Sequence, residues 1–194
     1  QAVNKAGTVT ITATVTENDK YTGATATCTV NVVDPSALPE AKALVAEDKE
    51  GILHAMKNEL GNTRLNAMEV YSLNGKIIDE GKADIKWYID NGTIQNIDGM
   101  YVVFEDANKA DIKLSSKKGN SWYYKSEDGS WNTKETDGRF LGYNEQITAF
   151  RTYSSSTYPK AVAMPIVDGY IRSTTSGDYG TICLPYAVAA EDMA

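Results

Sequence analysis

The sequence is poor in the side chains on which most enzyme and metal sites depend. Among its 194 residues there is one histidine, His54, and there are two cysteines, Cys28 and Cys183. Zinc sites need several His or Cys ligands close together, and Ser-His-Asp or Cys-His catalysis would have to use His54. Gly-x-Ser-x-Gly and phosphate-binding glycine motifs are missing too. We therefore expect a non-enzymatic protein without metal or cofactor, and we interpret His54 as an outward-facing strand residue.

Basic clusters and long apolar runs are also missing. The chain has 26 acidic and 19 basic residues, which gives a net charge of −7. Its longest basic run is Lys117-Lys118. Binding to a phosphate backbone needs basic clusters, and a membrane helix needs about 20 apolar residues in succession. We expect neither a nucleic-acid partner nor membrane insertion. The chain is nevertheless 42% hydrophobic, with twelve Tyr and three Trp, which is enough for a packed core.

Residues 1–33 contain two runs in which apolar and hydroxyl side chains alternate. The first is Gly7-Thr-Val-Thr-Ile-Thr-Ala-Thr-Val-Thr16, and the second is Ala24-Thr-Ala-Thr-Cys-Thr-Val-Asn-Val-Val33. A period of two with a turn-rich stretch between the runs predicts a β-hairpin with one apolar face. Because an isolated hairpin is marginally stable, we expect this face to pack against the tail strand Thr181–Leu184 or a neighbouring molecule.

These two runs resemble the closing hairpin of bacterial immunoglobulin-like domains of group 2, where G-T-x-T-I-T-A-x is followed by A-T-C-x-V-x-V. The earlier strands of such a domain do not precede them, so we interpret residues 1–33 as part of a module. Residues 177–188 are similar to the first strand of a C-terminal module of bacterial surface proteins, with the pattern G-x-[AG]-T-[IL]-x-L-P-[FY]. The resemblance implies an extracellular or outer-surface protein in which Ig-like modules act as spacers or adhesive stalks. Incomplete terminal modules also imply self-association.

The middle of the chain, residues 44–173, has the pattern of an all-β module. It follows a predicted linker, 34–43, that contains Pro35 and Pro39, and it precedes a further β segment, 174–194. Five Asn-Gly or Asp-Gly pairs, at 74, 91, 98, 128 and 137, provide tight turns. The predicted strands are Gly51–Lys57, Leu65–Ser72, Ile85–Ile89, Thr93–Gln95, Met100–Glu105, Asp111–Leu114, Trp122–Lys125, Phe140–Tyr143, Ala149–Tyr153 and Val162–Ile166.

A weak threefold repeat runs through this middle module. Gly51, Gly99 and Gly138 each precede an apolar run, and an alternating strand follows each run. Trp87 and Trp122 close the first two units, and Met164 occupies the corresponding place in the third. The pattern resembles the G-x-Y-L element of β-trefoil repeats, which implies a closed β-barrel. An OB-like barrel and a β-sandwich remain the alternatives.

Aromatic residues around the Asp128-Gly129 turn are the best candidates for a ligand site. They are Trp122, Tyr124 and Trp131, with Asn132 and Asp128 as hydrogen-bonding neighbours. In a strand Trp122 and Tyr124 would share one face, and an exposed aromatic ring stacks on the C–H face of a sugar. The alternative is that these rings pack in the core or in the hairpin. Acidic loops at Glu105–Asp111 and Glu127–Gly129 do not follow the D-x-[DN]-x-[DN]-G calcium pattern, so we interpret them as solvated turns.

Three hypotheses for function follow. The first is a non-enzymatic surface protein whose middle module binds a glycan or another host or cell-surface ligand. The second is a structural spacer, and the third is an accessory region of a glycan-degrading enzyme. Cys28 and Cys183 are far apart in the sequence and nothing in it demands a bond between them, so we interpret them as two small, buried apolar side chains.

Overall fold

The computed structural model describes residues 7–16, 20, 22–32 and 38–169. In this part of the chain there are sixteen β-strands and one 3-10 turn (η2, Glu145–Ile147), and no α-helix. The prediction of an all-β protein is confirmed. Every strand predicted in the middle module overlaps an observed strand.

The predicted N-terminal hairpin is present. Strands β1 (Gly7–Val15) and β2 (Ala24–Val32) pair antiparallel, with Ile11 opposite Cys28 and Ala13 opposite Ala26. Directly opposed residues share a face, so Ile11, Ala13, Cys28 and Ala26 form part of one apolar face. Ile11 is 57% exposed and Val15 is 62% exposed. The expected packing of this face is therefore not found against any described residue, and the tail strand Thr181–Leu184 lies outside the described part of the chain.

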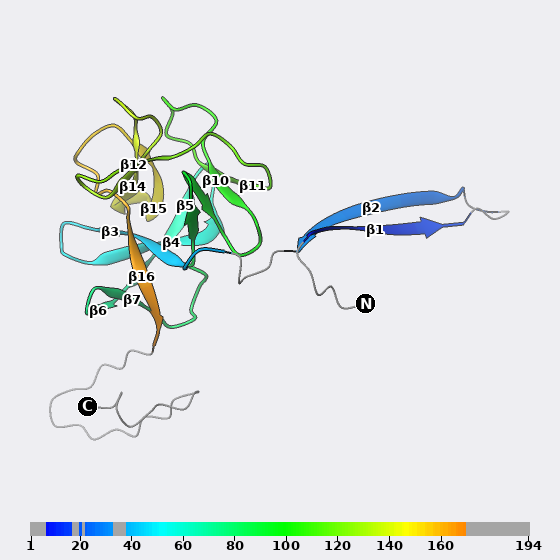
Figure 1. Cartoon of the computed structure of the whole chain (residues 1–194), viewed down its shortest axis with the longest axis horizontal. Coiled ribbons are helices and arrows are strands. Elements are labelled where there is room, and N and C mark those ends of the chain that lie inside the picture. The colour runs from blue at the N-terminus through cyan, green and yellow to red at the C-terminus, as the bar shows by residue number, and fades with distance from the viewer. Residues whose placement is uncertain (1–6, 17–19, 21, 33–37, 170–194) are drawn as a thin grey trace, which may run out of the picture.

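The remaining strands form two sheets (Figure 1). The smaller sheet has the order β11 (Lys113–Ser115), β10 (Tyr101–Val103), β9 (Thr93–Gln95) and β8 (Tyr88–Asp90). The larger sheet has ten strands, which in order across the sheet are β12 (Tyr123–Lys125), β13 (Ser130–Asn132), β14 (Phe140–Asn144), β15 (Ala149–Tyr153), β5 (Leu65–Val70), β4 (Leu53–Leu60), β3 (Lys42–Glu47), β16 (Val162–Asp168), β7 (Lys76–Asp79) and β6 (Ser72–Leu73).

Neither sheet closes on itself within the described residues. The larger sheet runs from β12 to β6 and the smaller from β11 to β8, so each has two free edges. In Figure 1 β12 lies at one end of the body, and β6 and β7 lie at the other. The closed barrel implied by the trefoil resemblance is therefore not observed. Strand β16 pairs with β3 on one side and, in parallel, with β7 on the other, so the larger sheet continues beyond β3 to β6.

The weak repeat corresponds to three antiparallel hairpins. Gly51, Gly99 and Gly138 precede β4, β10 and β14, and these strands pair with β5, β11 and β15 respectively. The Asn-Gly turns also form as predicted. Asn74 and Gly75 have φ angles of 50° and 77°, and Asn91 and Gly92 have 43° and 75°, the two successive positive φ values of a type I′ turn.

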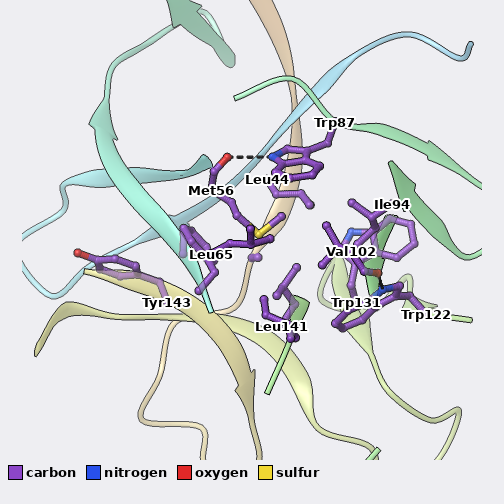
Figure 2. Close-up of a cluster of buried hydrophobic side chains, with 14 of the residues drawn as sticks. Leu44, Met56, Leu65, Trp87, Ile94, Val102, Trp122, Trp131, Leu141 and Tyr143 are labelled. Carbon is purple, nitrogen blue, oxygen red and sulfur yellow. Dashed lines mark hydrogen bonds between the residues drawn. The ribbon is translucent and has the colours of Figure 1, made fainter. Parts of the chain in front are cut away.

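Strand β3 separates two hydrophobic clusters. Leu44 and Ala46 belong to the larger cluster, whereas Ala43 and Val45 belong to the smaller one. The strand is covered on both faces because alternate residues point to opposite sides of a sheet. Figure 2 shows the larger cluster, in which Trp87, Trp122 and Trp131 lie among aliphatic residues. β3 begins at Lys42, so the last two residues of the segment interpreted as a linker are in a strand.

Candidate functional site

The β12–β13 hairpin brings Tyr124 and Trp131 together. The two residues are directly opposed across the strand pair, and their ring centroids are 4.9 Å apart with an interplanar angle of 42°. Tyr124 is 56% exposed, whereas Trp131 is only 8% exposed. The hairpin thus presents the exposed ring of Tyr124, which packs against the buried ring of Trp131.

An electrostatic contact fixes the turn of this hairpin. Gly129 has a φ of 68°, and Asp128 accepts a hydrogen bond from the Ser130 backbone N–H at 3.1 Å. The Lys160 ammonium pairs with the other carboxylate oxygen of Asp128. These contacts lower the pKa of Asp128 to about 2, with the Lys160 hydrogen bond as the largest cause. The turn therefore stays charged and anchored at neutral pH.

A hollow of about 480 Å³ opens beside the two rings. Tyr124, Trp131 and Gly129 contribute one side of its lining, and Val162 and Ala163 of β16 contribute another. The smaller sheet contributes Ile89, and the chain leading into β3 contributes Pro39, Glu40 and Lys42. Ligand sites are typically concave, about 300–1,000 Å³ in volume, and mostly apolar with a few polar groups. The hollow has a volume in this range, and its lining is about equally polar and apolar.

Trp131 has an unusual polar atom for a buried residue. Its indole N–H is inaccessible to solvent and has no hydrogen-bond acceptor among the described residues. Leaving a buried donor unpaired costs about 1–3 kcal/mol, and the other two tryptophans do not bear this cost.

Trp122 does not belong to this site, contrary to the prediction. It is 3% exposed, and its indole N–H donates to the Val102 carbonyl oxygen at 2.9 Å. Phe104 packs edge-on against it, with ring centroids 4.9 Å apart. Trp122 lies just before β12, and its backbone N–H bonds to the Gly92 carbonyl oxygen, which draws it toward the smaller sheet. Trp122 is therefore a core residue, whereas Tyr124 is exposed.

Asn132 is also unavailable to a ligand. It is 3% exposed, and its amide donates to the Ser130 hydroxyl at 2.8 Å. Of the four predicted site residues, the structure therefore brings only Tyr124 and Trp131 together at the hollow. The sequence analysis missed Lys42, Ile89 and Val162, because residues so distant in the chain meet only through sheet topology.

A second, smaller hollow of about 190 Å³ lies near His54. The histidine does not face outward as expected. Its ring stacks on Tyr143 at 4.3 Å between centroids, and Nε2 is 2.8 Å from Oδ2 of Asp48. The bond from His54 and the backbone N–H of Ile52 lower the pKa of Asp48. Burial, reinforced by the charges of Asp48 and Glu145, raises the pKa of Tyr143.

The acidic loops considered for calcium have partners of their own. Glu105 pairs with Lys113, Asp111 with Arg151 and Asp128 with Lys160. Within the described residues no three His, Cys, Asp or Glu side chains gather as a metal site would require. Cys28 is exposed, not buried as expected, and has no disulfide partner among the described residues, and Cys183, the other cysteine, lies outside them.

Comparison of the chain with protein-family models, with curated proteins and with solved structures finds no match. In the part of the chain that the structure describes, no helix is long and apolar enough to cross a membrane.

Proposed function

We propose that the chain is a non-enzymatic, extracellular binding or adhesion protein, and that the hollow beside Tyr124 and Trp131 holds a sugar unit of a glycan. The observation that carries the proposal is the exposed Tyr124 ring, which leans on Trp131 at the edge of a hollow of about 480 Å³. Glycans bind to proteins by stacking the C–H face of a ring on an aromatic side chain and by hydrogen-bonding their hydroxyls to polar groups. The hollow offers both kinds of contact.

In this proposal each part of the hollow has a separate task. The Tyr124 ring stacks on the sugar, and Trp131 holds Tyr124 in place from below. Val162, Ala163 and Ile89 exclude water from the apolar side of the sugar. Glu40 and Lys42 hydrogen-bond to its hydroxyls or other polar substituents. No bond is made or broken in the ligand.

The proposed extracellular location rests on the resemblance of residues 1–33 to a bacterial Ig-like hairpin. The described strands agree with that pattern, because β1 and β2 pair along their whole length and carry no charged residue. Such a ribbon on one side of the binding module would act as a stalk or connector.

Glycan-array binding tests the proposal, with Tyr124→Ala as the variant and Tyr123→Ala as its matched control. Tyr123 is the preceding residue of β12 and is also exposed, at 43%, but it does not line the hollow. We expect the wild type and Tyr123→Ala to bind the same glycans. Tyr124→Ala should lose at least about tenfold in affinity, since a central aromatic contact is worth about 2 kcal/mol. Equal binding by both variants would contradict the proposal.

The structural-spacer hypothesis is the second candidate, and the exposed β1–β2 ribbon favours it. A spacer needs no ligand, so it predicts that no glycan on the array binds to the wild type. An accessory role in a glycan-degrading enzyme would use the same hollow, and it differs only in what the chain is joined to.

A further inference from the structure

We infer that the sugar held in the hollow carries one negatively charged group, and that Lys42 pairs with it. The inference rests on the proposed function, because it names the class of ligand for the same site. Its basis is the position of a single lysine whose charge has no counterion among the described residues.

The backbone of Lys42 is fixed in place. Its N–H donates to the Trp87 carbonyl oxygen, and its carbonyl oxygen accepts from the Trp87 N–H, both at 2.9 Å. Lys42 also pairs with Pro165 in the β3–β16 ladder. The side chain therefore starts from a rigid point at the lining of the hollow, and this rigidity reduces the entropy that binding must remove.

The Lys42 ammonium differs from those lysines that are already paired with a carboxylate. Six other lysines make ion pairs with a carboxylate: Lys57, Lys82, Lys86, Lys109, Lys113 and Lys160. Lys42 has no such contact within the described residues, and it is half-buried rather than fully exposed. A lysine that lines the hollow without a carboxylate partner can pair with an anion that enters it, because a charge-assisted hydrogen bond is stronger than a neutral one.

The class of anion is limited by the charge of the whole protein. The net charge is −7, and Glu40 lines the same hollow. The negative charge of the protein would repel a densely charged polyanion. A glycan with a single acidic unit in an otherwise neutral chain would be repelled much less. A uronic acid carboxylate and a sulfate ester share the chemistry that Lys42 recognises. The ligand is accordingly a mostly neutral glycan with an isolated acidic sugar.

Titration calorimetry with three matched oligosaccharides tests this inference. The first carries one glucuronic acid unit, the second is its carboxyl-reduced neutral form, and the third carries a sulfate ester at the same place. We expect the wild type to bind one of the acidic forms about five- to tenfold more tightly than the neutral form, a difference of about 1–1.4 kcal/mol. The better of the two acidic forms identifies the source of the anion.

Two substitutions assign that preference to the hollow. Lys42→Gln should remove the preference, because it weakens binding of the acidic form more than binding of the neutral form, to whose hydroxyls the Gln amide can still donate. Glu40→Gln should increase the preference, because it removes a negative charge from the lining of the hollow. Lys125→Gln is the control for loss of charge, because Lys125 is also half-buried without a carboxylate partner among the described residues but does not line the hollow. It should keep the preference of the wild type.

The outcomes separate this inference from the proposed function. Equal binding of acidic and neutral forms, or loss of the preference in Lys125→Gln, overturns the role of Lys42 while leaving a sugar site in place. If Lys42→Gln weakens both forms equally, Lys42 supports the hollow without selecting the ligand, and the inference is wrong. If none of the three oligosaccharides binds and the glycan array is also empty, the proposed function itself fails.

Discussion

The indole N–H of Trp87 donates a hydrogen bond to the carbonyl oxygen of Met56 at 2.9 Å, and both residues are fully buried (Figure 2). Trp122 makes the equivalent bond to Val102. In each case a tryptophan that follows a hairpin is tied to the first strand of that hairpin, β4 or β10. The two bonds occur at corresponding places of the weak sequence repeat. Each ties one hairpin to a tryptophan of the larger cluster.

The first prediction concerns these bonds. Trp87→Phe and Trp122→Phe each leave a buried carbonyl oxygen without its donor, which should lower the free energy of unfolding by about 1–3 kcal/mol. Trp131→Phe is the control, since its N–H has no acceptor among the described residues and its loss breaks no bond. Urea denaturation of the three variants measures the difference. Equal destabilisation by all three would show that ring volume, and not the hydrogen bond, determines the cost.

The second prediction concerns the turn between β8 and β9. Gly92 has a φ of 75°, and a Cβ atom there would lie 2.7 Å from the backbone carbonyl oxygen of Trp122. Gly75 has a similar φ of 77° with nothing within 4 Å. Gly75→Ala should therefore cost only the backbone strain of about 1 kcal/mol. Gly92→Ala should cost about 2 kcal/mol or more, because backbone must move as well.

Thermal unfolding monitored by circular dichroism compares the two glycine variants directly. Gly92→Ala should melt several degrees below Gly75→Ala. A melting temperature for Gly92→Ala equal to or above that of Gly75→Ala would contradict the close approach of the β8–β9 turn to Trp122.

The third prediction is a pH dependence at the β12–β13 turn. The Lys160 ammonium and the Ser130 N–H lower the pKa of Asp128 from 3.8 to about 2. Because the pKa is depressed in the folded state, the stabilisation is fully present above about pH 4 and is lost as the pH falls toward 2. The Asp128 side chain is about one-third exposed, at 37%, so after solvent screening we expect about 1 kcal/mol.

Urea unfolding of the wild type and Asp128→Asn at pH 7, 4 and 2 measures this effect. The wild type should be the more stable by about 1 kcal/mol at pH 7, and the difference should shrink toward pH 2. Other carboxylates titrate in the same range, but they are common to both proteins and cancel in the difference. A gap that widens as the pH falls would have the wrong sign for this ion pair.

The fourth prediction concerns the exposed face of the β1–β2 ribbon. Cys28 is exposed and lies opposite Ile11. In the reduced native chain Cys28 should react with iodoacetamide about as fast as the same cysteine in the denatured chain, because no described residue covers it. Peptide mapping by mass spectrometry measures the rate. Strong protection that disappears in denaturant would mean that another segment or a second copy packs on this face.

The sequence pattern predicted those features that depend on neighbouring residues. Asn74-Gly75 and Asn91-Gly92 form the expected turns, since glycine and asparagine tolerate positive φ. Strand β3 was missed because its residues Ala43–Ala46 are apolar and buried on both faces, so they lack the alternation of a half-exposed strand. The assignment of Trp122 to the site was wrong because its backbone N–H donates to Gly92, thirty positions earlier in the chain, and its indole N–H donates to Val102 in the core. Such non-local contacts leave no local pattern.

The measurement that tests the central claim most directly is calorimetric titration of the full chain with the best glycan from the array, for the wild type, Tyr124→Ala and Tyr123→Ala. Our account predicts that Tyr123→Ala binds like the wild type and that Tyr124→Ala loses at least about tenfold in affinity. All three proteins should have the same circular dichroism spectrum, because both tyrosines are exposed. Unchanged affinity in Tyr124→Ala, or an equal loss in Tyr123→Ala, would contradict a sugar site in this hollow.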